Sequence, residues 1–264
     1  QSGNGIAGWG WNISGLSSIR RIPSTKFHDN IIDPVDFDGL DRFSLDGQRM
    51  ILKSGRYGAA NSEYQTENFS NVKIKAYGTT NISGPAYFIV YFPDGSKAWY
   101  GSTSNGNVEQ GGRGYLEWLL IKKQDPQGNF IAYTYLNPPP NGSSQYNVRT
   151  LRINTIKYGS NGNTAPPNEV KFFYKERWRA ETSFVGGTNF KNGHILEKVI
   201  VMGGGELYRK YEISHNISSS RYQKISSITE INKNNESFSP IEFTYKESPI
   251  NEIEHEGISS NSPI

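Results

Sequence analysis

Four aspartates gather in the stretch DPVDFDGLD and could bind a metal ion: Asp33, Asp36, Asp38 and Asp41. Carboxylate oxygens clustered around a glycine are the ligands that Ca²⁺ prefers. An EF-hand loop alternates its acidic positions and ends in a glutamate, whereas this stretch has spacings of three, two and three and no such glutamate. We therefore favour a polar turn with an Asp-Gly corner that leads into a strand at 42–45 over a calcium loop. We expect no cofactor, with Ca²⁺ at these aspartates as the alternative.

Glycines and tryptophans crowd the stretch GNGIAGWGWNIS, residues 3–14. A phosphate-binding loop needs a strand before it and a helix after it, or a Gly-Lys-Ser/Thr ending, and this stretch has none of these. We therefore interpret it as a packing corner in which glycines allow close approach and positive φ. Trp9 and Trp11 would share a face if they lay on one strand. We expect Trp9 to be largely buried and at least one of four glycines to have positive φ: Gly3, Gly5, Gly8 or Gly10.

Two short elements invite comparison with ADP-ribosyltransferases, which use a Ser-Thr-Ser and a Glu-x-Glu motif. Here these would be residues 102–104 and 252–254, with Glu254 stabilising an oxocarbenium-like transition state and Arg56 holding the cofactor phosphates. About 150 residues separate the two elements, which is long for one compact site. The transferase is therefore the third functional hypothesis, and we expect the chain not to be an enzyme.

Other kinds of catalytic site lack their residues. The chain has no cysteine, which excludes thiol nucleophiles, disulfides and cysteine-based metal sites. No metal-binding motif is formed by its four histidines, which are His28, His194, His215 and His255. No Gly-x-Ser-x-Gly elbow is present either. Five tryptophans could line a sugar-binding platform, although the positions of Trp99 and Trp118 in strand-like stretches favour the core.

The composition indicates a folded β-protein with no polyanionic partner. The 264 residues carry a net charge of +3, and aromatic residues make up 13%, which argues against disorder. No run of 18 apolar residues is present, so we expect no membrane span. No signal peptide is visible, and the sequence begins within the glycine-rich motif. We expect the chain to be a piece of a longer polypeptide.

Strand–turn–strand units repeat along the chain and predict an all-β fold. Each unit has a turn rich in Gly, Asp or Asn between β-rich stretches. Their ranges are 43–55, 86–102, 116–137, 151–176, 195–216 and 222–245. Helical periodicity is weak throughout. We predict repeated antiparallel hairpins that form large curved sheets or a β-sandwich or shell fragment, with very little helix.

We expect one module over residues 1–264. The best internal subdivision lies near 137–145, where three prolines and an Asn-Gly pair interrupt the strands. The same hairpin pattern continues on both sides of it. Residues 257–264 are expected to be a tail or linker.

The N-terminal motif resembles the SpvB/toxin-complex B-component family, which is related to RHS/YD-repeat proteins. The resemblance covers nearly the whole chain. The sequence lacks the strands that precede the Gly-Asn-Gly motif in that family and the repeat region expected after the module. Its most specific part is GNGIAGWGWNISGLSSIRRIPS followed by DRFSLDGQRMIL. The motif positions are Gly3, Asn4, Gly5, Gly8, Trp9, Trp11, Arg21, Phe43 and Gly47. The later stretches PDGSKAWYG, DPQGNFIAYTY and FFYKERWRAETSFVGGTNF also fit it.

This resemblance implies a non-enzymatic structural module of a secreted or cell-surface virulence protein. Such a module would contribute to a β-shell that encloses or scaffolds a C-terminal toxin or effector. Its partners would be other segments of its own polypeptide or a partner shell or toxin subunit, with no nucleic acid. The alternative is a carbohydrate- or surface-binding adhesion module built on the same sheets.

Overall fold

The computed structural model describes residues 3–79, 84–102, 106–110, 114–136, 151–162 and 164–246. Within these ranges the chain is all-β, as predicted, apart from the four-residue helix α1 (Lys26–Asp29). The predicted boundary at 137–145 and the predicted tail at 257–264 lie outside the described residues. None of the helical structure in the described ranges is long and apolar enough to cross a membrane.

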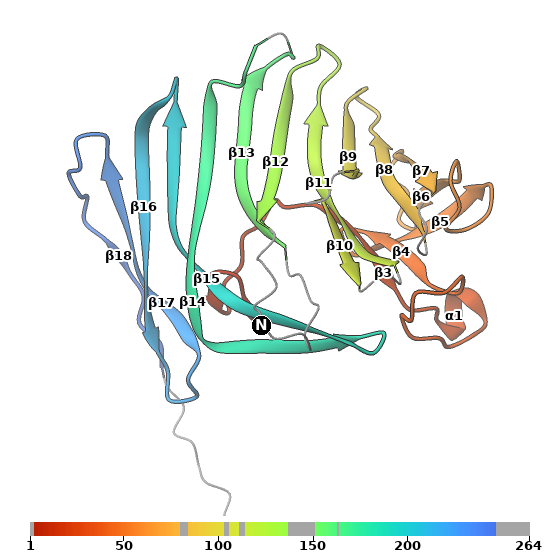
Figure 1. The fold of residues 1–264 in the computed structure, drawn as a ribbon, viewed down its shortest axis with the longest axis horizontal. Coiled ribbons are helices and arrows are strands. Elements are labelled where there is room, and N and C mark those ends of the chain that lie inside the picture. The colour runs from red at the N-terminus through yellow and green to blue at the C-terminus, as the bar shows by residue number, and fades with distance from the viewer. Residues whose placement is uncertain are drawn as a thin grey trace, which may run out of the picture.

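Sixteen strands form one continuous antiparallel sheet, and eight of them close into a ring (Figure 1). Closure arises because the path from β3 to β9 returns to β11, which pairs with both ends. The ring strands are β3 (Ser18–Ile22), β4 (Arg42–Leu45), β5 (Gln48–Ser54), β6 (Glu63–Thr66), β7 (Lys73–Thr79), β8 (Pro85–Tyr91), β9 (Lys97–Gly101) and β11 (Gly114–Gln124).

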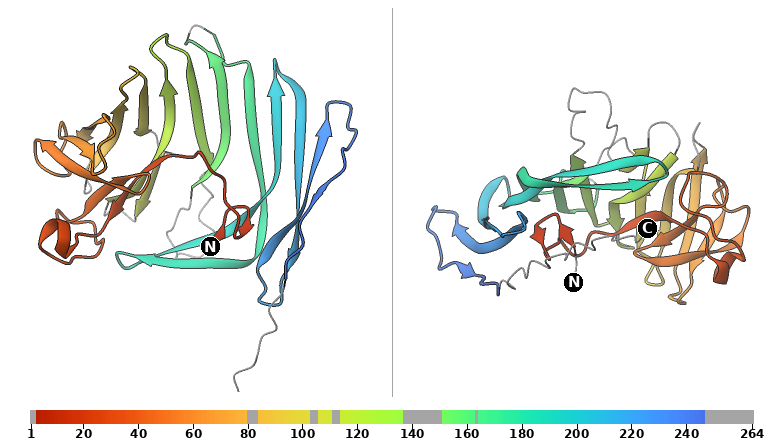
Figure 2. Two further views of the ribbon diagram at one scale, coloured as in Figure 1. Left: turned by 180° about the vertical axis from the view of Figure 1, so that it is seen from behind. Right: turned by 90° about the horizontal axis from the view of Figure 1, so that it is seen from below.

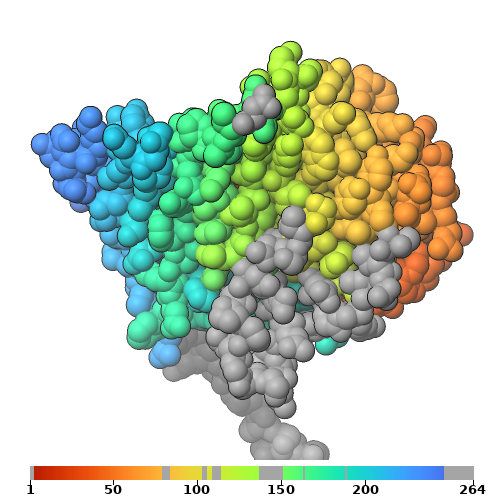
Figure 3. All heavy atoms as spheres, turned by 45° about the horizontal axis from the view of Figure 1, so that its top comes forward, coloured from red at the N-terminus to blue at the C-terminus, as the bar shows by residue number. Residues whose placement is uncertain are grey.

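Strand β11 belongs to both the ring and the rest of the sheet. Its first half pairs with β3 and with β10 (Asn107–Gln110), and its second half pairs with β9 and β12. Beyond it the sheet stays open and continues in chain order. The colours of successive segments follow one another across the molecule in the same order (Figure 3). The strands of this open sheet are β12 (Phe130–Leu136), β13 (Arg152–Ser160), β14 (Asn168–Val185), β15 (Thr188–Gly203), β16 (Glu206–Ile217), β17 (Gln223–Asn232) and β18 (Ile241–Glu242).

All six predicted hairpins are present. They are β4–β5, β8–β9, β11–β12, β13–β14, β15–β16 and β17–β18, and every pair is antiparallel. At the β4–β5 turn both Asp46 (φ 49°) and Gly47 (φ 82°) are left-handed, which matches the twist that a two-residue hairpin needs. The turn signals in the sequence therefore predict the local pairing correctly.

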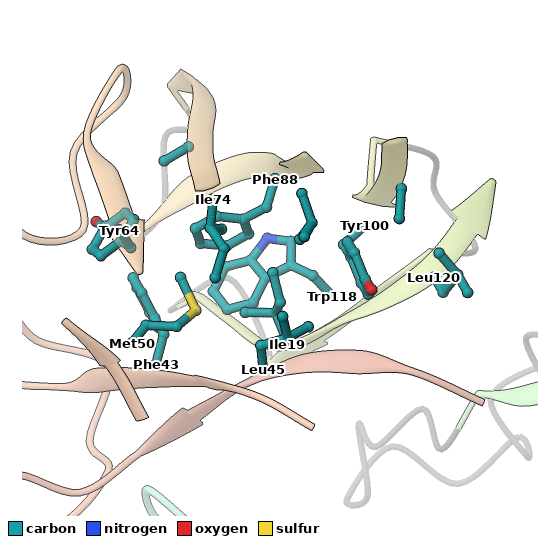
Figure 4. Packing of buried hydrophobic residues seen from close by; sticks show 13 residues of the cluster. Ile19, Phe43, Leu45, Met50, Tyr64, Ile74, Phe88, Tyr100, Trp118 and Leu120 are labelled. Atoms are coloured by element: carbon teal, nitrogen blue, oxygen red, sulfur yellow. The ribbon is translucent and has the colours of Figure 1, made fainter. Parts of the chain in front are cut away.

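The ring encloses an aromatic core to which all eight of its strands contribute (Figure 4). Trp118 lies at its centre and is fully buried. Its indole N–H donates to the carbonyl of Pro85 at 3.1 Å, and its ring meets the edges of Phe43 and Phe88 at centroid distances of 5.3 and 5.0 Å. Edge-to-face contacts of this kind stabilise a core beyond the area that they bury.

A second core joins the N-terminal segment to the open sheet. Ala7 and the half-buried Trp11 pack with buried residues of six strands: Tyr135, Ile153, Phe172, Leu196, Ile213 and Ile225. The segment contains the small hairpin of β1 (Asn4–Gly5) and β2 (Gly8–Trp9). The N-terminal motif therefore lies against strands that are far from it in the sequence.

The hairpin of β14 and β15 bends sharply and reaches back toward the ring. A register shift interrupts the pairing after Phe173, and a second, larger irregularity separates Glu176, opposite His194, from Glu181, opposite Asn192. We call residues 177–193, beyond this irregularity, the arm. Figures 1 and 2 show the arm running across the lower end of the curved sheet toward the ring. Its residues Val185 and Phe190 join Phe37 in a third apolar cluster.

Candidate functional site

Arg177 holds the N-terminal motif against the base of the arm. Its guanidinium donates to the side-chain oxygen of Asn4, to the carbonyl of Gly5 at 2.7 Å and to the carbonyl of His194 at 3.2 Å. The amide nitrogen of Asn4 donates in turn to the Glu181 carboxylate at 3.2 Å. Burial lowers the pKa of Arg177, and the nearby Glu181 opposes this shift. Three segments therefore meet at one buried cation.

Glycine is required at the corner for two different physical reasons. A Cβ on Gly5 would lie 2.2 Å from the Trp11 carbonyl oxygen, so the backbone approach there excludes any side chain. Gly8 and Gly10 have φ values of 128° and 79°, which confirms the prediction of positive φ. His215 donates from Nε2 to the Ala7 carbonyl at 3.0 Å and ties this corner to β16.

The prediction that Trp9 is largely buried is wrong. Trp9 is 36% exposed and lies against Tyr222 with a centroid distance of 4.3 Å. The expected shared face requires a strand that continues through both tryptophans, but β2 ends at Trp9 and Gly10 turns the backbone. Trp11 faces elsewhere: it meets the edge of Phe243 and donates to the hydroxyl of Tyr245 at 2.9 Å.

The motif residues Arg21 and Phe43 lie in the wall and core of the ring. Arg21 is 3% exposed and forms an ion pair with Asp41 at 2.8 Å. Its guanidinium also lies over the rings of Phe37, Phe43 and Trp118 at 5.4, 5.5 and 5.8 Å. A buried arginine that is both paired and stacked orients the groups around it. This part of the motif is therefore structural.

We call residues 33–41 the aspartate loop. Each of its four aspartates offers a carboxylate oxygen, and these four oxygens all lie within 4.8 Å of one another. The Asp41 carboxylate already has other partners: it accepts hydrogen bonds from Arg21 and from the backbone N–H of Phe37, the latter at 2.9 Å. Asp33 keeps a buried carboxylate oxygen without a hydrogen-bond partner among the described residues. Burial, and then repulsion from Asp36 and Asp38, raise the pKa of Asp33. Calcium at this loop stays a prediction.

The same loop also supplies the socket for the tip of the arm. Asp41 fixes the backbone of Phe37, which is 6% exposed and has the unusual φ of 73°. A Cβ on Gly186, at the tip of the arm, would lie 2.7 Å from the Phe37 ring. The polar turn that leads into β4 therefore packs against the tip of the arm through Phe37.

A family model covers both parts of the N-terminal motif. The family described as "SpvB: Salmonella virulence plasmid 65kDa B protein" matches residues 1–180, which is more than half of the chain. The chain belongs to the SpvB family. A search of curated proteins finds no match.

Three solved structures share the fold of this SpvB-family chain. The N-terminal domain of effector protein SpvB from Salmonella typhimurium strain LT2 has a TM-score of 0.70 and 14% identity, covering 88% of this chain and 91% of that one. The complex TcdB2-TccC3-Cdc42 has a TM-score of 0.71 and 15% identity, covering 93% of this chain and 15% of that one. The Photorhabdus luminescens Tc holotoxin pore has a TM-score of 0.73 and 15% identity, covering 92% of this chain and 14% of that one. The SpvB-family chain therefore spans about one-seventh of the toxin-complex chains that it matches.

The residues of the transferase hypothesis are not brought together within the described part of this SpvB-family chain. Thr103, Ser104 and Glu254 lie outside the described residues, and Arg56 is exposed beside the β5–β6 turn. Three histidines are described, in separate settings: His28 pairs with Glu67, His194 borders a cavity, and His215 contacts Ala7. His255 lies outside the described ranges.

Arg177 is the functional residue that sequence reasoning missed. It lies in FFYKERWRAETSFVGGTNF, which carries part of the family resemblance. The sequence held a signal there, but nothing in it connects this arginine to Asn4, which lies 173 positions away.

Proposed function

We propose that this SpvB-family chain is a non-enzymatic structural module of a longer, secreted or cell-surface virulence protein. It contributes to a β-shell that encloses or scaffolds a toxin or effector. The observation that carries the proposal is the likeness to TcdB2-TccC3, which extends over 93% of this chain at a TM-score of 0.71. Its partners are other segments of the same polypeptide or a partner shell or toxin subunit.

The arrangement of the described residues supports this role. The ring core and the Arg177 contacts use the buried polar groups to fix strands rather than to line a reactive cleft. The open sheet ends at β18, which has only two residues, and no further strand pairs with its outer edge among the described residues. An exposed edge of this kind is an aggregation risk that further strands or neighbouring segments would cover.

The test is protection of the segment that follows this module in the full-length protein. We expect a protease to cut that segment slowly in the assembled protein and rapidly when the segment is expressed alone. Arg177→Met, which loosens the module, should increase cutting in the assembled protein, while the exposed Arg179→Met should not. Equal cutting of the assembled and isolated segment would contradict the enclosing role.

A second candidate, the adhesion module, is favoured by one exposed aromatic surface. Trp9 stacks on Tyr222, Arg179 lies over the same Tyr222 ring at 4.5 Å, and Trp178 is 67% exposed. The backbone N–H of Trp178 donates to the side chain of Gln223, next to Tyr222. Aromatic faces beside polar groups suit sugar rings.

Glycan-array binding would distinguish the adhesion candidate from the shell. If the surface binds sugars, Trp9→Ala and Trp178→Ala should each remove the signal, while Phe184→Ala on the arm should keep it. A strong signal with this pattern would favour the adhesion module over the shell. Binding that survives both tryptophan substitutions would contradict the assignment of sugar binding to this surface.

A further inference from the structure

Strands β13 and β14 separate part-way along their length. They pair at four positions, ending at Thr155 opposite Lys171. Beyond this point β13 continues to pair only with β12, as far as Arg152, and β14 continues to pair only with β15. The Tyr174 hydroxyl spans the separation and donates to the carbonyl of Ile153 at 2.7 Å. A cavity of about 540 Å³ lies between the two strands.

Arg152 is the unusual residue in the cavity wall. Its guanidinium carbon lies 5.2 Å from the centre of the Tyr174 ring, and its Nε is buried without a hydrogen-bond partner among the described residues. Burial lowers the pKa of Arg152, and among the described groups only Tyr174 opposes this shift. A half-buried arginine without a carboxylate partner is costly, since buried cations are normally paired.

The remaining wall combines basic and apolar side chains. Lys171 and His194 line it together with Arg152. Lys171 already pairs with Glu169 at 3.2 Å. Burial, and then the charge of Arg152, lower the pKa of His194, which keeps its imidazole neutral at pH 7. Leu136 and Phe173 add apolar surface. The Arg152 guanidinium is therefore available to bind the anionic group of an amphipathic ligand.

We propose that this cavity binds a carboxylate presented by an extended acidic peptide segment, with Arg152 as its ion-pair partner. A planar guanidinium matches a carboxylate with two parallel hydrogen bonds. The apolar wall favours a carboxylate carried on a chain with apolar neighbours over inorganic phosphate. The separated strand edges offer backbone groups to an extended peptide. The proposal goes beyond the shell role and does not depend on it.

The test uses a fluorescein-labelled peptide of sequence Glu-Phe-Glu-Phe-Glu and its matched Gln-Phe-Gln-Phe-Gln control, with anisotropy as the readout. We expect the acidic peptide to bind and the glutamine peptide to bind at least about tenfold more weakly, since charge-assisted hydrogen bonds carry the difference. Arg152→Met should weaken the acidic peptide by about tenfold or more, and Arg152→Lys should weaken it less. The exposed Arg20→Met should leave binding unchanged.

Thermal unfolding of the same variants separates binding from folding. Because Arg152 has no described carboxylate partner, Arg152→Met should keep or raise the unfolding midpoint. If it lowers the midpoint, Arg152→Gln gives the binding comparison instead. Equal binding of both peptides, unchanged binding to Arg152→Met, or no binding up to about 1 mM would each overturn the proposal. Free 3-phenylpropionate binding as tightly as the peptide would overturn the assignment to a peptide.

Discussion

Arg177 of β14 donates to the side-chain oxygen of Asn4 in β1, although 173 positions separate the two residues in the chain. The contact joins two parts of the family motif, the Gly-Asn-Gly start and the KERWRAE stretch. It lies where β14 loses its regular pairing and the arm begins. One buried side chain therefore fixes both the N-terminal corner and the direction of the arm.

Replacing Arg177 with methionine should destabilise the fold strongly. The substitution leaves the carbonyls of Gly5 and His194 and the amide of Asn4 without their donor. Each buried group left unsatisfied costs about 1–3 kcal/mol, so we expect the loss of three such bonds to lower the free energy of unfolding by at least about 3 kcal/mol. Urea denaturation measures this.

The matched control for this prediction is Arg179→Met. Arg179 is exposed and lies over the Tyr222 ring, a contact worth about 0.5–1 kcal/mol at such a site. A loss from Arg177→Met no larger than the loss from Arg179→Met would show that the corner does not depend on the Arg177 contacts.

Local pairing was predictable from the sequence because each hairpin is specified by its own turn. Asp46-Gly47 needs only two left-handed residues, and nothing distant alters that requirement. Ring closure was not predictable, since it depends on β11 pairing with β3 along one half and with β9 along the other. The turn that joins a strand to one partner carries no information about the strand that pairs with its other edge.

Only those features of the candidate site that depend on the backbone conformation of single residues were predictable from the sequence. Positive φ at Gly8 and Gly10 followed from their residue type. The exposure of Trp9 did not, because it depends on β2 ending after two residues. The Arg152 cavity was missed altogether, since it arises from the separation of two strands and leaves no trace in composition or spacing.

Phe37 should control how firmly the arm attaches to the ring. Its side chain is 6% exposed and packs with Val185 and Phe190 of the arm. Truncation of a buried phenylalanine costs about 3–5 kcal/mol, so Phe37→Ala should lower stability by about 3 kcal/mol. Limited proteolysis should then cut within residues 177–193 faster than in the unsubstituted protein.

Phe184→Ala is the control within the same arm, because Phe184 is 73% exposed. We expect it to change stability by no more than about 0.5 kcal/mol and to leave the cutting pattern unchanged. Equal sensitivity of both variants to protease would mean that the arm is not held by the Phe37 socket.

Acidification should destabilise the N-terminal corner through His215. Burial, more than any other factor, lowers the pKa of His215 below its ordinary value of 6.5, and Lys175 and Arg177 add to this effect while the Ala7 carbonyl and Glu197 oppose it. The unfolded chain therefore binds the proton more readily. Stability is fully present above about pH 6.5 and falls as the pH drops toward the folded-state pKa.

Urea denaturation at several pH values between about 7 and 5 measures this slope. His215→Gln keeps a donor for the Ala7 carbonyl but cannot titrate, so its slope should be smaller. His194 retains part of the slope in that variant, since burial also lowers its pKa. A His215→Gln slope equal to that of the unsubstituted protein would contradict the assignment.

Calcium should stabilise the aspartate loop if Asp33, Asp36 and Asp38 bind the ion together. Asp33, Asp36 and Asp38 lie close enough to share one ion, and Asp36 and Asp38 raise the pKa of Asp33. A divalent cation relieves this repulsion, so millimolar Ca²⁺ should raise the unfolding midpoint, and Mg²⁺ should do so less because it demands stricter geometry. Asp33→Asn should remove the increase, while Glu206→Gln, an exposed acidic residue outside the loop, should retain it. An unchanged midpoint with Ca²⁺ would leave the loop with its packing role at Phe37 alone.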